Sequence, residues 1–216
     1  MERYTTIPQS ASLTAPFTQG GLILGITGGT GCGKTTLLNL IAAQGGLVLD
    51  CDAIYHQLLQ KDHSLLQAIE YRFPGTVTDG TLDRKKLGAI VFSDENALLD
   101  LNRITHSAVK TEVLRLLETA PALAAIDAIG LFESGLDSLC DVTVAITAPE
   151  EDRILRLMAR DHISEDYARS RIAAQHSNEW FSEKCSYTLE NSGELDAFAT
   201  KCLAFLHTIG IMKENS

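Results

Sequence analysis

The segment that most constrains the fold is residues 25–36, "GITGGTGCGKTT", which follows the apolar run "GLIL" and precedes "LLNLIAA". It contains the pattern G-x-x-x-x-G-K-[ST], matched by Gly28, Gly33, Lys34 and Thr35. In this pattern the glycines let successive backbone N–H groups turn inward on phosphate oxygens, the lysine reaches the outer phosphates, and the hydroxyl reaches Mg²⁺. We therefore expect a strand, a phosphate-binding loop and a helix in that order, with a nucleoside triphosphate and a magnesium ion as ligands.

The whole loop is expected to contact the nucleotide, and the expected contacts are Gly28, Gly29, Gly31, Cys32, Gly33, Lys34, Thr35 and Thr36. A dinucleotide-binding G-x-G-x-x-G is the weaker interpretation, because the register that starts at Gly29 places Lys34 where the third glycine belongs. Cys32 adds a separate hypothesis: a thiol beside a lysine at a helix N-terminus could have a lowered pKa and be open to oxidation or alkylation. The alternative is that Cys32 is simply a small residue that the loop tolerates.

From residue 22 onward, short apolar runs alternate with segments of helical spacing. The first run, the helix after the loop and the run at 47–50 form a βαβ unit, which implies a parallel sheet with a right-handed crossover. Further strands are expected at 122–129, at 141–148 and, as an edge strand, at 187–191. The predicted fold class is α/β, a P-loop NTPase-type parallel sheet flanked by helices.

Two further parts are expected to be added to this sheet. One is a mainly helical insert, interrupted by "RFPGTVTDGTLDRKKL", and the other is a helical lid made from the polar helical hairpin "DHISEDYARSRIAAQH". Residues 1–20 are rich in Ser, Thr, Gln and Pro and are expected to form a mobile extension. The expected division is a domain over 21–212, with its core at 21–60, 121–160 and 186–212, the insert at about 61–120 and the lid at about 161–185.

Two carboxylates follow the second expected strand, in "LVLDCDAIYH". Ligands of open parallel sheets bind at the carboxyl ends of the strands, so Asp50 and Asp52 are expected beside the phosphate-binding loop. On an extended segment, residues two apart point to the same side, so that one carboxylate could orient an acceptor hydroxyl while the other assists. The alternative, which the spacing leaves open, is that Asp52 only caps the helix that begins "AIYHQLL".

Arginines gather after the fourth expected strand. Arg153, Arg156 and Arg160 fall at i, i+3 and i+7 and share a helix face, and Arg169 and Arg171 follow. Five interleaved acids favour a solvated face with surface ion pairs: Glu151, Asp152, Asp161, Glu165 and Asp166. The functional alternative is a lid whose arginines close over the phosphates and stabilise the charge of the transition state.

Composition excludes several classes of protein. The formal net charge of −10 argues against non-specific nucleic-acid binding, and apolar runs of the roughly 18 residues needed to span a bilayer are lacking. The five cysteines form no C-x-x-C pair, so a reducing, cytoplasmic location is expected, with neither a disulfide framework nor a zinc knuckle. A monomer is expected, with weak self-association left open.

Together these motifs resemble the dephospho-coenzyme A kinase family, over about residues 21–198. The markers are "GITGGTGCGKTT", "DCDAIYH", "DGTLDRKKLGAIVFSD", "LNRITHSAVKTE", "LFESGL", "RLMARDHISEDYARSRIAAQ" and Asn191-Ser192-Gly193. The resemblance implies transfer of the γ-phosphate of ATP, with Mg²⁺, to the ribose 3′-hydroxyl of dephospho-coenzyme A, which gives coenzyme A and ADP. This is the last step of coenzyme A biosynthesis.

The resemblance also implies roles for single residues. Asp52 matches the catalytic carboxylate and Asp50 its partner, and Lys34 and Arg160 are the expected catalytic cations. Thr35 and Asp52 are the expected metal ligands, and Asn191 the expected nucleotide contact outside the loop. Asp50, Asp52, Arg84 and His106 are the expected contacts of dephospho-coenzyme A. The chain departs from the family pattern at Ser107, at Ile129-Gly130 and at Cys185-Ser186.

Other functions remain open at this stage. A GTPase is not indicated, because an N-K-x-D base-reading motif does not occur. Another small-molecule kinase, for nucleosides or shikimate, would share the fold and the loop. A non-enzymatic alternative is a binding protein that holds ATP and signals by lid movement, although Asp52 beside the loop favours catalysis.

Overall fold

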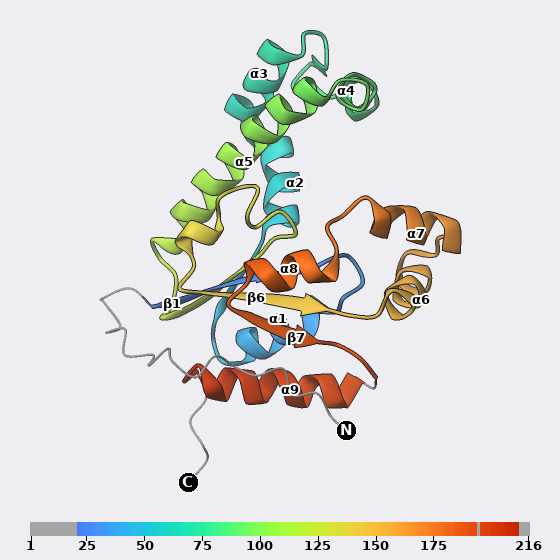
Figure 1. Ribbon diagram of the computed structural model, residues 1–216. Coiled ribbons are helices and arrows are strands. Elements are labelled where there is room, and N and C mark those ends of the chain that lie inside the picture. Colours follow the sequence, from blue (N-terminus) through green and yellow to red (C-terminus); the bar gives the residue numbers. More distant parts are fainter. Residues whose placement is uncertain (1–20, 194, 212–216) are drawn as a thin grey trace.

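The computed structural model describes residues 21–193 and 195–211, and its centre is a five-stranded parallel sheet in the order β2-β5-β1-β6-β7 (Figure 1). The expected extension at 1–20 lies outside the described residues. The strands are β1 (Leu22–Thr27), β2 (Leu47–Asp50), β5 (Leu123–Asp127), β6 (Val142–Thr147) and β7 (Tyr187–Glu190). All four pairings are parallel, and β7 is an edge strand. The α/β fold class, the five strands and the edge position of the last one are therefore confirmed.

Helices cover both faces of the sheet. On one face, α1 (Lys34–Ala43) contacts α9 (Leu195–Thr208), and apolar side chains of both helices pack with those of β1 and β6 in one buried cluster. On the other face, the long helix α5 (Glu95–Leu117) packs Val109 and Val113 against β2 and β5. The short η1 (Asp137–Leu139) and α8 (Asn178–Lys184) complete the cover, and α8 contacts β6. The sheet is buried on both sides, as its continuous apolar strands require.

The insert leaves the sheet without an intervening loop. β2 ends at Asp50 and α2 (Cys51–Lys61) begins at the next residue. The insert continues with α3 (His63–Arg72), a hairpin of β3 (Val77–Thr78) and β4 (Thr81–Leu82), α4 (Arg84–Val91) and then α5, which returns to the sheet. It has its own apolar cluster, centred on Ile69, Phe73 and Leu87. The insert is thus mainly helical, as expected, and is packed around a core separate from that of the sheet.

The small hairpin lies within the segment that interrupts the helical spacing. Its turn is Asp79-Gly80, and both residues have positive φ, 50° and 72°. Asp-Gly is the sequence that such a two-residue turn prefers, because glycine adopts a left-handed backbone without a steric penalty and aspartate tolerates it.

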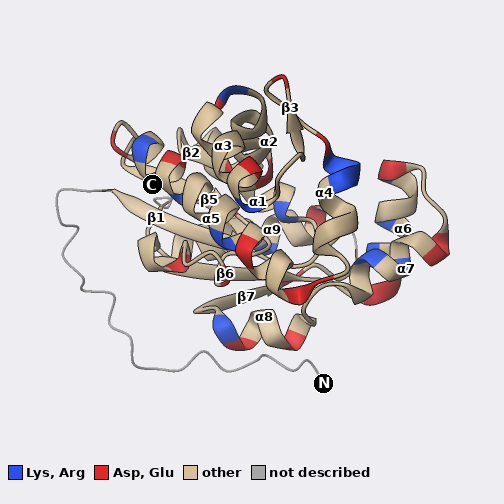
Figure 2. Ribbon diagram, turned by 90° about the horizontal axis from the view of Figure 1, so that it is seen from above, with Lys and Arg blue, Asp and Glu red and all other residues tan. Residues whose placement is uncertain are grey.

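Two helices stand beyond the carboxyl end of β6: α6 (Glu150–Asp161) and α7 (Glu165–Ala173), which contact each other (Figure 1). Acidic and basic segments alternate along both helices (Figure 2). His162 ends α6 in a left-handed conformation, with φ of 55°, and turns the chain back toward α7. The expected hairpin at 161–176 forms the single helix α7, and α6 brings its arginines to the end of the sheet where β1 opens into the phosphate-binding loop.

Candidate active site

The phosphate-binding loop is held in a conformation that only glycine allows at two of its positions. Gly28 has φ of 135°, and a Cβ there would lie 2.1 Å from the carbonyl oxygen of Ile146 in β6. Gly33, the residue before α1, has φ of 90°, and a Cβ there would lie 2.3 Å from the side-chain amide nitrogen of Asn191. The loop is therefore wedged against the ends of β6 and β7, and larger residues at these two positions would force it outward.

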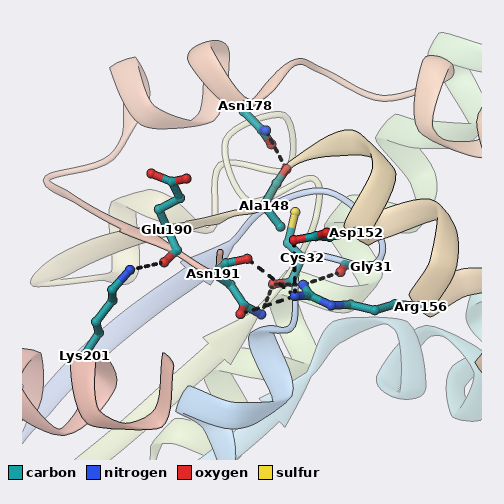
Figure 3. A network of polar contacts seen from close by, with 9 residues as sticks. All are labelled: Gly31, Cys32, Ala148, Asp152, Arg156, Asn178, Glu190, Asn191 and Lys201. Carbon is teal, nitrogen blue, oxygen red and sulfur yellow. Dashed lines mark hydrogen bonds and ion pairs between the residues drawn. The ribbon is translucent and has the colours of Figure 1, made fainter. Parts of the chain in front are cut away.

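Side chains from distant segments hold the backbone of this loop. Arg153 donates from Nε to the Thr30 carbonyl at 2.9 Å, and the Thr30 N–H donates to Oε1 of Gln175 at 2.8 Å. Asn191 donates its amide to the Cys32 carbonyl at 2.9 Å (Figure 3). These contacts fix the loop before any ligand arrives, which is the preorganisation that phosphate binding needs.

Arg156 completes this network. Its guanidinium donates to the Gly31 carbonyl at 3.2 Å and to Oδ1 of Asn191 at 3.4 Å (Figure 3). Arg156 also lines the main cavity, which is the hollow beside the phosphate-binding loop. Its positive charge therefore lies between the loop backbone and this cavity.

The arginines of α6 share one helix face, as their spacing predicts, but the interpretation of that face as solvated is wrong for Arg153. It holds in part for Arg156, which is partly exposed and pairs with Asp152 at 3.9 Å. Arg153 is only 4% exposed, and Arg153 and Arg156 both donate to loop carbonyls. The interleaved acids suggested a solvated surface. Residue spacing shows which side chains share a helix face, but it does not show what that face packs against. The solvated interpretation holds for Arg169, which pairs with Glu150, Glu151 and Glu165.

Arg160 is exposed and lines the main cavity. It pairs with Asp161 at 2.7 Å, and Asp161 also pairs with Arg171 at 2.6 Å. Hydrogen bonds from these two guanidinium groups hold the pKa of the Asp161 carboxyl far below its usual range. The cluster presents net positive charge at the cavity wall, because two arginines share one carboxylate.

The main cavity has a volume of about 740 Å³ and lies at the carboxyl ends of the strands, as predicted. Gly31, Gly33, Lys34 and Thr35 of the loop line it, together with three carboxylates: Asp50, Asp52 and Asp127. A triphosphate-sized anion would therefore meet the first turn of α1 on one side and carboxylates on the other.

The two carboxylates after β2 reach this cavity in a way that differs from the prediction. Asp50 caps α2, because its Oδ1 accepts a hydrogen bond from the N–H of Ala53 at 3.0 Å, whereas Asp52 lies in the first turn of the helix. The expectation that both lie on one extended segment is wrong, and so is the alternative that Asp52 is the cap. Both expectations fail because α2 begins two residues earlier than expected. Asp50 is therefore the capping residue, and Asp52 is exposed to the cavity.

Asp127 is a site residue that the sequence analysis missed. It ends β5 directly beside Asp50 of β2, and its Oδ1 lies 3.6 Å from Nζ of Lys34. Burial raises the pKa of the Asp127 carboxyl, and the positive charge of Lys34 partly offsets the effect. This oxygen is buried without a hydrogen bond within the described residues. An acid at the end of an apolar strand run, level with Asp50, is the signal that could have found it.

These groups fit a magnesium ion that is bound together with phosphates. Within residues 21–193 and 195–211, His, Cys, Asp and Glu do not form a group of three that could hold a metal alone. Magnesium in phosphoryl-transfer sites is usually bound by one or two protein oxygens, with phosphates and waters as the remaining ligands. The exposed hydroxyl of Thr35 and the buried Oδ1 of Asp127, which accepts no hydrogen bond in the described part of the chain, suit that coordination, and the predicted ligands Thr35 and Asp52 both line the cavity.

A second cavity, of about 230 Å³, lies between α2, α5 and the loop after β5. His106 lines it, as do Tyr55 and Asn102, whereas Arg84 lines neither cavity. Burial lowers the pKa of His106, and the nearby Glu133 partly offsets the effect. Three residues line both cavities: Asp52, Ala128 and Ile129. Asp52 is thus a carboxylate at the junction of the two spaces.

Several residues that were predicted to contact the nucleotide do not line the main cavity. Gly28, Gly29, Cys32, Thr36 and Asn191 are absent from that wall. Cys32 is fully buried, and burial raises the pKa of its thiol, so the hypothesis of a lowered pKa is wrong. Positive charge from Arg153 and Lys34 acts in the predicted direction but is outweighed by the cost of burying a thiolate.

The three departures from the family pattern lie at different distances from the site. Ile129-Gly130 lies in the walls between the two cavities. Ser107 is exposed on α5, next to His106. Ser186 bonds Thr143 ahead of β7, at the end of the strand pair opposite to the phosphate-binding loop. In the described part of the chain, none of the helices is long and apolar enough to cross a membrane.

Comparisons with known proteins cover the whole of this site. A family model described as "Dephospho-CoA kinase" matches residues 22–197. A dephospho-CoA kinase of Anaeromyxobacter dehalogenans is 37% identical over 185 residues, which are 83% of this chain and 88% of the relative. A crystal structure from Thermus thermophilus superposes with a TM-score of 0.74 at 31% identity, over 88% of this chain and 98% of that one. For a dephospho-CoA kinase from Campylobacter jejuni, the TM-score is 0.60 at 25% identity, over 87% and 96%.

Proposed function

The chain belongs to the dephospho-CoA kinase family, and from that premise we propose that it transfers the γ-phosphate of ATP to the ribose 3′-hydroxyl of dephospho-coenzyme A. The products are ADP and coenzyme A, so the reaction completes coenzyme A synthesis. The observation that carries the proposal is that Asp52 lines both cavities. The main cavity beside the loop is the donor cavity, and the second cavity next to α5 is the acceptor cavity.

On the donor side, the chain holds the phosphates by backbone and charge. The first N–H groups of α1 lack partners within the helix, as in any α-helix, and the loop aims them at the cavity. Lys34 donates to the Gly28 carbonyl at 3.1 Å and pairs with Asp127, which keeps its ammonium group at the cavity wall. Arg156 and Arg160 add positive charge to the cavity wall, where it can stabilise the charge that spreads over the transferred group.

On the acceptor side, Asp52 receives or orients the proton of the attacking hydroxyl. A carboxylate between two ligand spaces can contact an alcohol in one while the phosphate approaches from the other. Thr35, with Asp52 or Asp127, would hold Mg²⁺, which neutralises phosphate charge when it is bound. His106 lies deeper in the acceptor cavity and contacts the substrate there, with Asp50 fixing the start of α2.

Two roles rest on the family resemblance more than on position. Arg84 is exposed at the start of α4; burial raises the pKa of Tyr55, and the positive charge of Arg84 partly offsets the effect. We assign it to the outer part of the coenzyme A moiety, beyond the cavity wall. Asn191 acts on ATP by holding the Cys32 carbonyl. The free cysteines fit a reducing, cytoplasmic compartment, and the chain acts as a monomer.

One assay tests this function against its alternatives. ADP formation from ATP and Mg²⁺ is measured with dephospho-coenzyme A, and separately with adenosine, AMP and shikimate as acceptors. We expect stimulation by dephospho-coenzyme A alone, with coenzyme A as the product by mass spectrometry. Stimulation by another acceptor would identify a different small-molecule kinase, and ATP binding without turnover on any of them would identify a binding protein.

A further inference from the structure

An aromatic and ionic cluster lies just beyond α7, outside the residues assigned above. The imidazole of His176 stacks on the indole of Trp180, with ring centroids 3.8 Å apart and planes within 9° of parallel. On its edge, Nε2 of His176 lies 2.8 Å from Oε1 of Glu133. His176 is therefore held at the same time by a stacking contact and by a polar contact with Glu133, which is an ion pair when the imidazole is protonated.

The cluster joins three segments that are far apart in the sequence. Glu133 belongs to the loop after β5, His176 to the connection that follows α7, and Trp180 to α8. Phe132 packs its ring edge on Trp180 at 5.9 Å, and the buried Phe181 contacts Trp180 at 5.2 Å. The end of the predicted lid is thus fastened to the loop after β5 and to the helix that covers β6.

Both fastened segments carry groups of the active site. Next to His176, Gln175 accepts the hydrogen bond from the Thr30 N–H, and Gln175 lines the main cavity. In the loop that carries Glu133, Ile129 lines the donor and acceptor cavities and accepts a hydrogen bond from the Thr27 hydroxyl. A shift of either segment would therefore move the walls in which the two substrates meet.

The cluster borders a cavity and does not fill an apolar core. A third cavity, of about 310 Å³, is lined by Ile129, Gly130, Gln175 and the two ion-paired residues. The side chains of His176 and Glu133 are 47% and 38% exposed, so the pair is open to solvent and to protons. Histidine is the side chain whose charge ordinarily changes between about pH 5 and 8.

From these contacts we propose that His176 and Trp180 are positioning residues, which clamp the end of the lid to the Glu133 loop and so set Gln175 and Ile129 for ATP binding. The charged and titratable groups facing the cluster are Glu133 from the loop, His106 from α5 beside the Glu133 backbone, and Arg153 from α6 beside Gln175. On α8, Lys184 lies 5.9 Å from the centroid of the Trp180 ring and Glu179 precedes that residue. The protonated imidazole strengthens the clamp, because it pairs with the Glu133 carboxylate.

The chain offers a direct spectroscopic test, because Trp180 is its single tryptophan. A protonated imidazole stacked on an indole quenches its fluorescence. Fluorescence of Trp180 should therefore be stronger in His176→Gln than in the wild-type chain. The matched control is His207→Gln, at an exposed histidine on α9, which should leave the fluorescence unchanged. Equal fluorescence of His176→Gln and the wild type would overturn the stacking assignment.

Kinetics test the positioning role, and this part rests on the proposed function. His176→Gln, Glu133→Gln and Trp180→Leu should each raise KM for ATP about fivefold while changing kcat less than twofold, and Trp180→Phe should restore most of the loss. Glu183→Gln, at an exposed acid on α8, is the control for Glu133→Gln.

The two measurements distinguish failure of the clamp from failure of the function. If the wild type phosphorylates dephospho-coenzyme A and the three variants match it in KM for ATP, the positioning role is wrong and the function stands. If the wild type does not phosphorylate it, the function is wrong, and ATP dissociation constants of the same variants decide on the clamp. Unchanged dissociation constants would overturn it.

Discussion

The two halves of the active site are built differently. The donor half is a loop whose backbone is gripped by side chains from α6, from the segment after α7 and from the end of β7. The acceptor half is a smaller cavity between two helices of an insert that has its own apolar core. The donor half is therefore preorganised by polar contacts, whereas the acceptor half depends on how the insert is placed against the sheet. Changes on the two sides should separate ATP binding from acceptor binding.

The largest effect is expected at the junction of the two halves. Asp52→Asn should lower kcat about 10³-fold, because the amide cannot accept the proton of the hydroxyl, while ATP binding changes less than twofold. Steady-state kinetics and ATP calorimetry measure the two quantities, with Asp196→Asn, an exposed acid on α9, as the control. Unchanged turnover would show that Asp52 has no part in the mechanism, although it lines both cavities.

The next effect breaks the donor half alone. Arg153→Met should lower the free energy of unfolding by about 2–3 kcal/mol, because the buried Thr30 carbonyl loses its donor, and should weaken ATP binding as well. Chemical denaturation and calorimetry measure both. Arg103→Met, at an arginine whose side chain is 78% exposed, should cost less than about 0.5 kcal/mol. Equal costs for the two variants would contradict the structural role of Arg153.

A change in the acceptor half should have a smaller and separable effect. His106→Asn should raise KM for dephospho-coenzyme A about tenfold, equivalent to about 1.4 kcal/mol, and leave KM for ATP unchanged. Initial rates at varied concentrations of each substrate measure this. A rise in KM for ATP instead would show that the two halves are not separable at His106.

The same residue gives a pH dependence of stability. Burial lowers the pKa of His106 below 6.5, so the unfolded chain takes up this proton at a higher pH than the folded one. Its contribution to stability is therefore present above about pH 6.5 and is lost as the pH falls through the folded pKa. Urea titrations across this range should show a shallower loss of stability for His106→Asn than for the wild type. Parallel curves would contradict the burial of a neutral imidazole.

The smallest effect is expected behind the loop. Because burial raises the pKa of Cys32, alkylation of this thiol at pH 7.5 should be at least about tenfold slower than that of a free thiol. Peptide mass spectrometry after timed labelling measures the rate. Cys32→Ala should change KM for ATP less than about threefold, since only a small buried side chain is lost. Fast labelling that ATP prevents would show instead that Cys32 is a reactive thiol at the loop.

The donor half could be predicted from the sequence because a few neighbouring residues carry its geometry. The glycines, the lysine and the threonine of residues 25–36 are contiguous, and the apolar runs on either side mark the strand and the helix. The five strands of the parallel sheet were likewise found from their apolar runs, with boundaries that differ by at most two residues, whereas β3 and β4 were not predicted. The α/β fold and the end of the sheet that holds the site follow from these local patterns.

The remaining parts of the site depend on packing between distant segments. Arg153 has the spacing of a surface helix, and its burial arises only because α6 lies against the loop. Asp127 is an isolated acid in the sequence, and it becomes a site residue because β5 places it beside Asp50. The roles of Asp50 and Asp52 depended on where α2 begins, and helix boundaries are the least certain part of any reading of a sequence.

The direct passage from β2 into α2 has a mechanical consequence. α2 has eleven residues and is roughly 16 Å long, with Asp52 in the turn nearest the sheet and the rest of the insert attached at its far end. If α2 tilts, Asp52 lies close to the attachment of the helix to the sheet. A tilt of about 10° would carry the far end of α2 by roughly 3 Å and Asp52 by only a fraction of that distance. α5 joins the insert to the sheet a second time, so a shift of the insert would leave this carboxylate nearly in place beside the phosphate-binding loop.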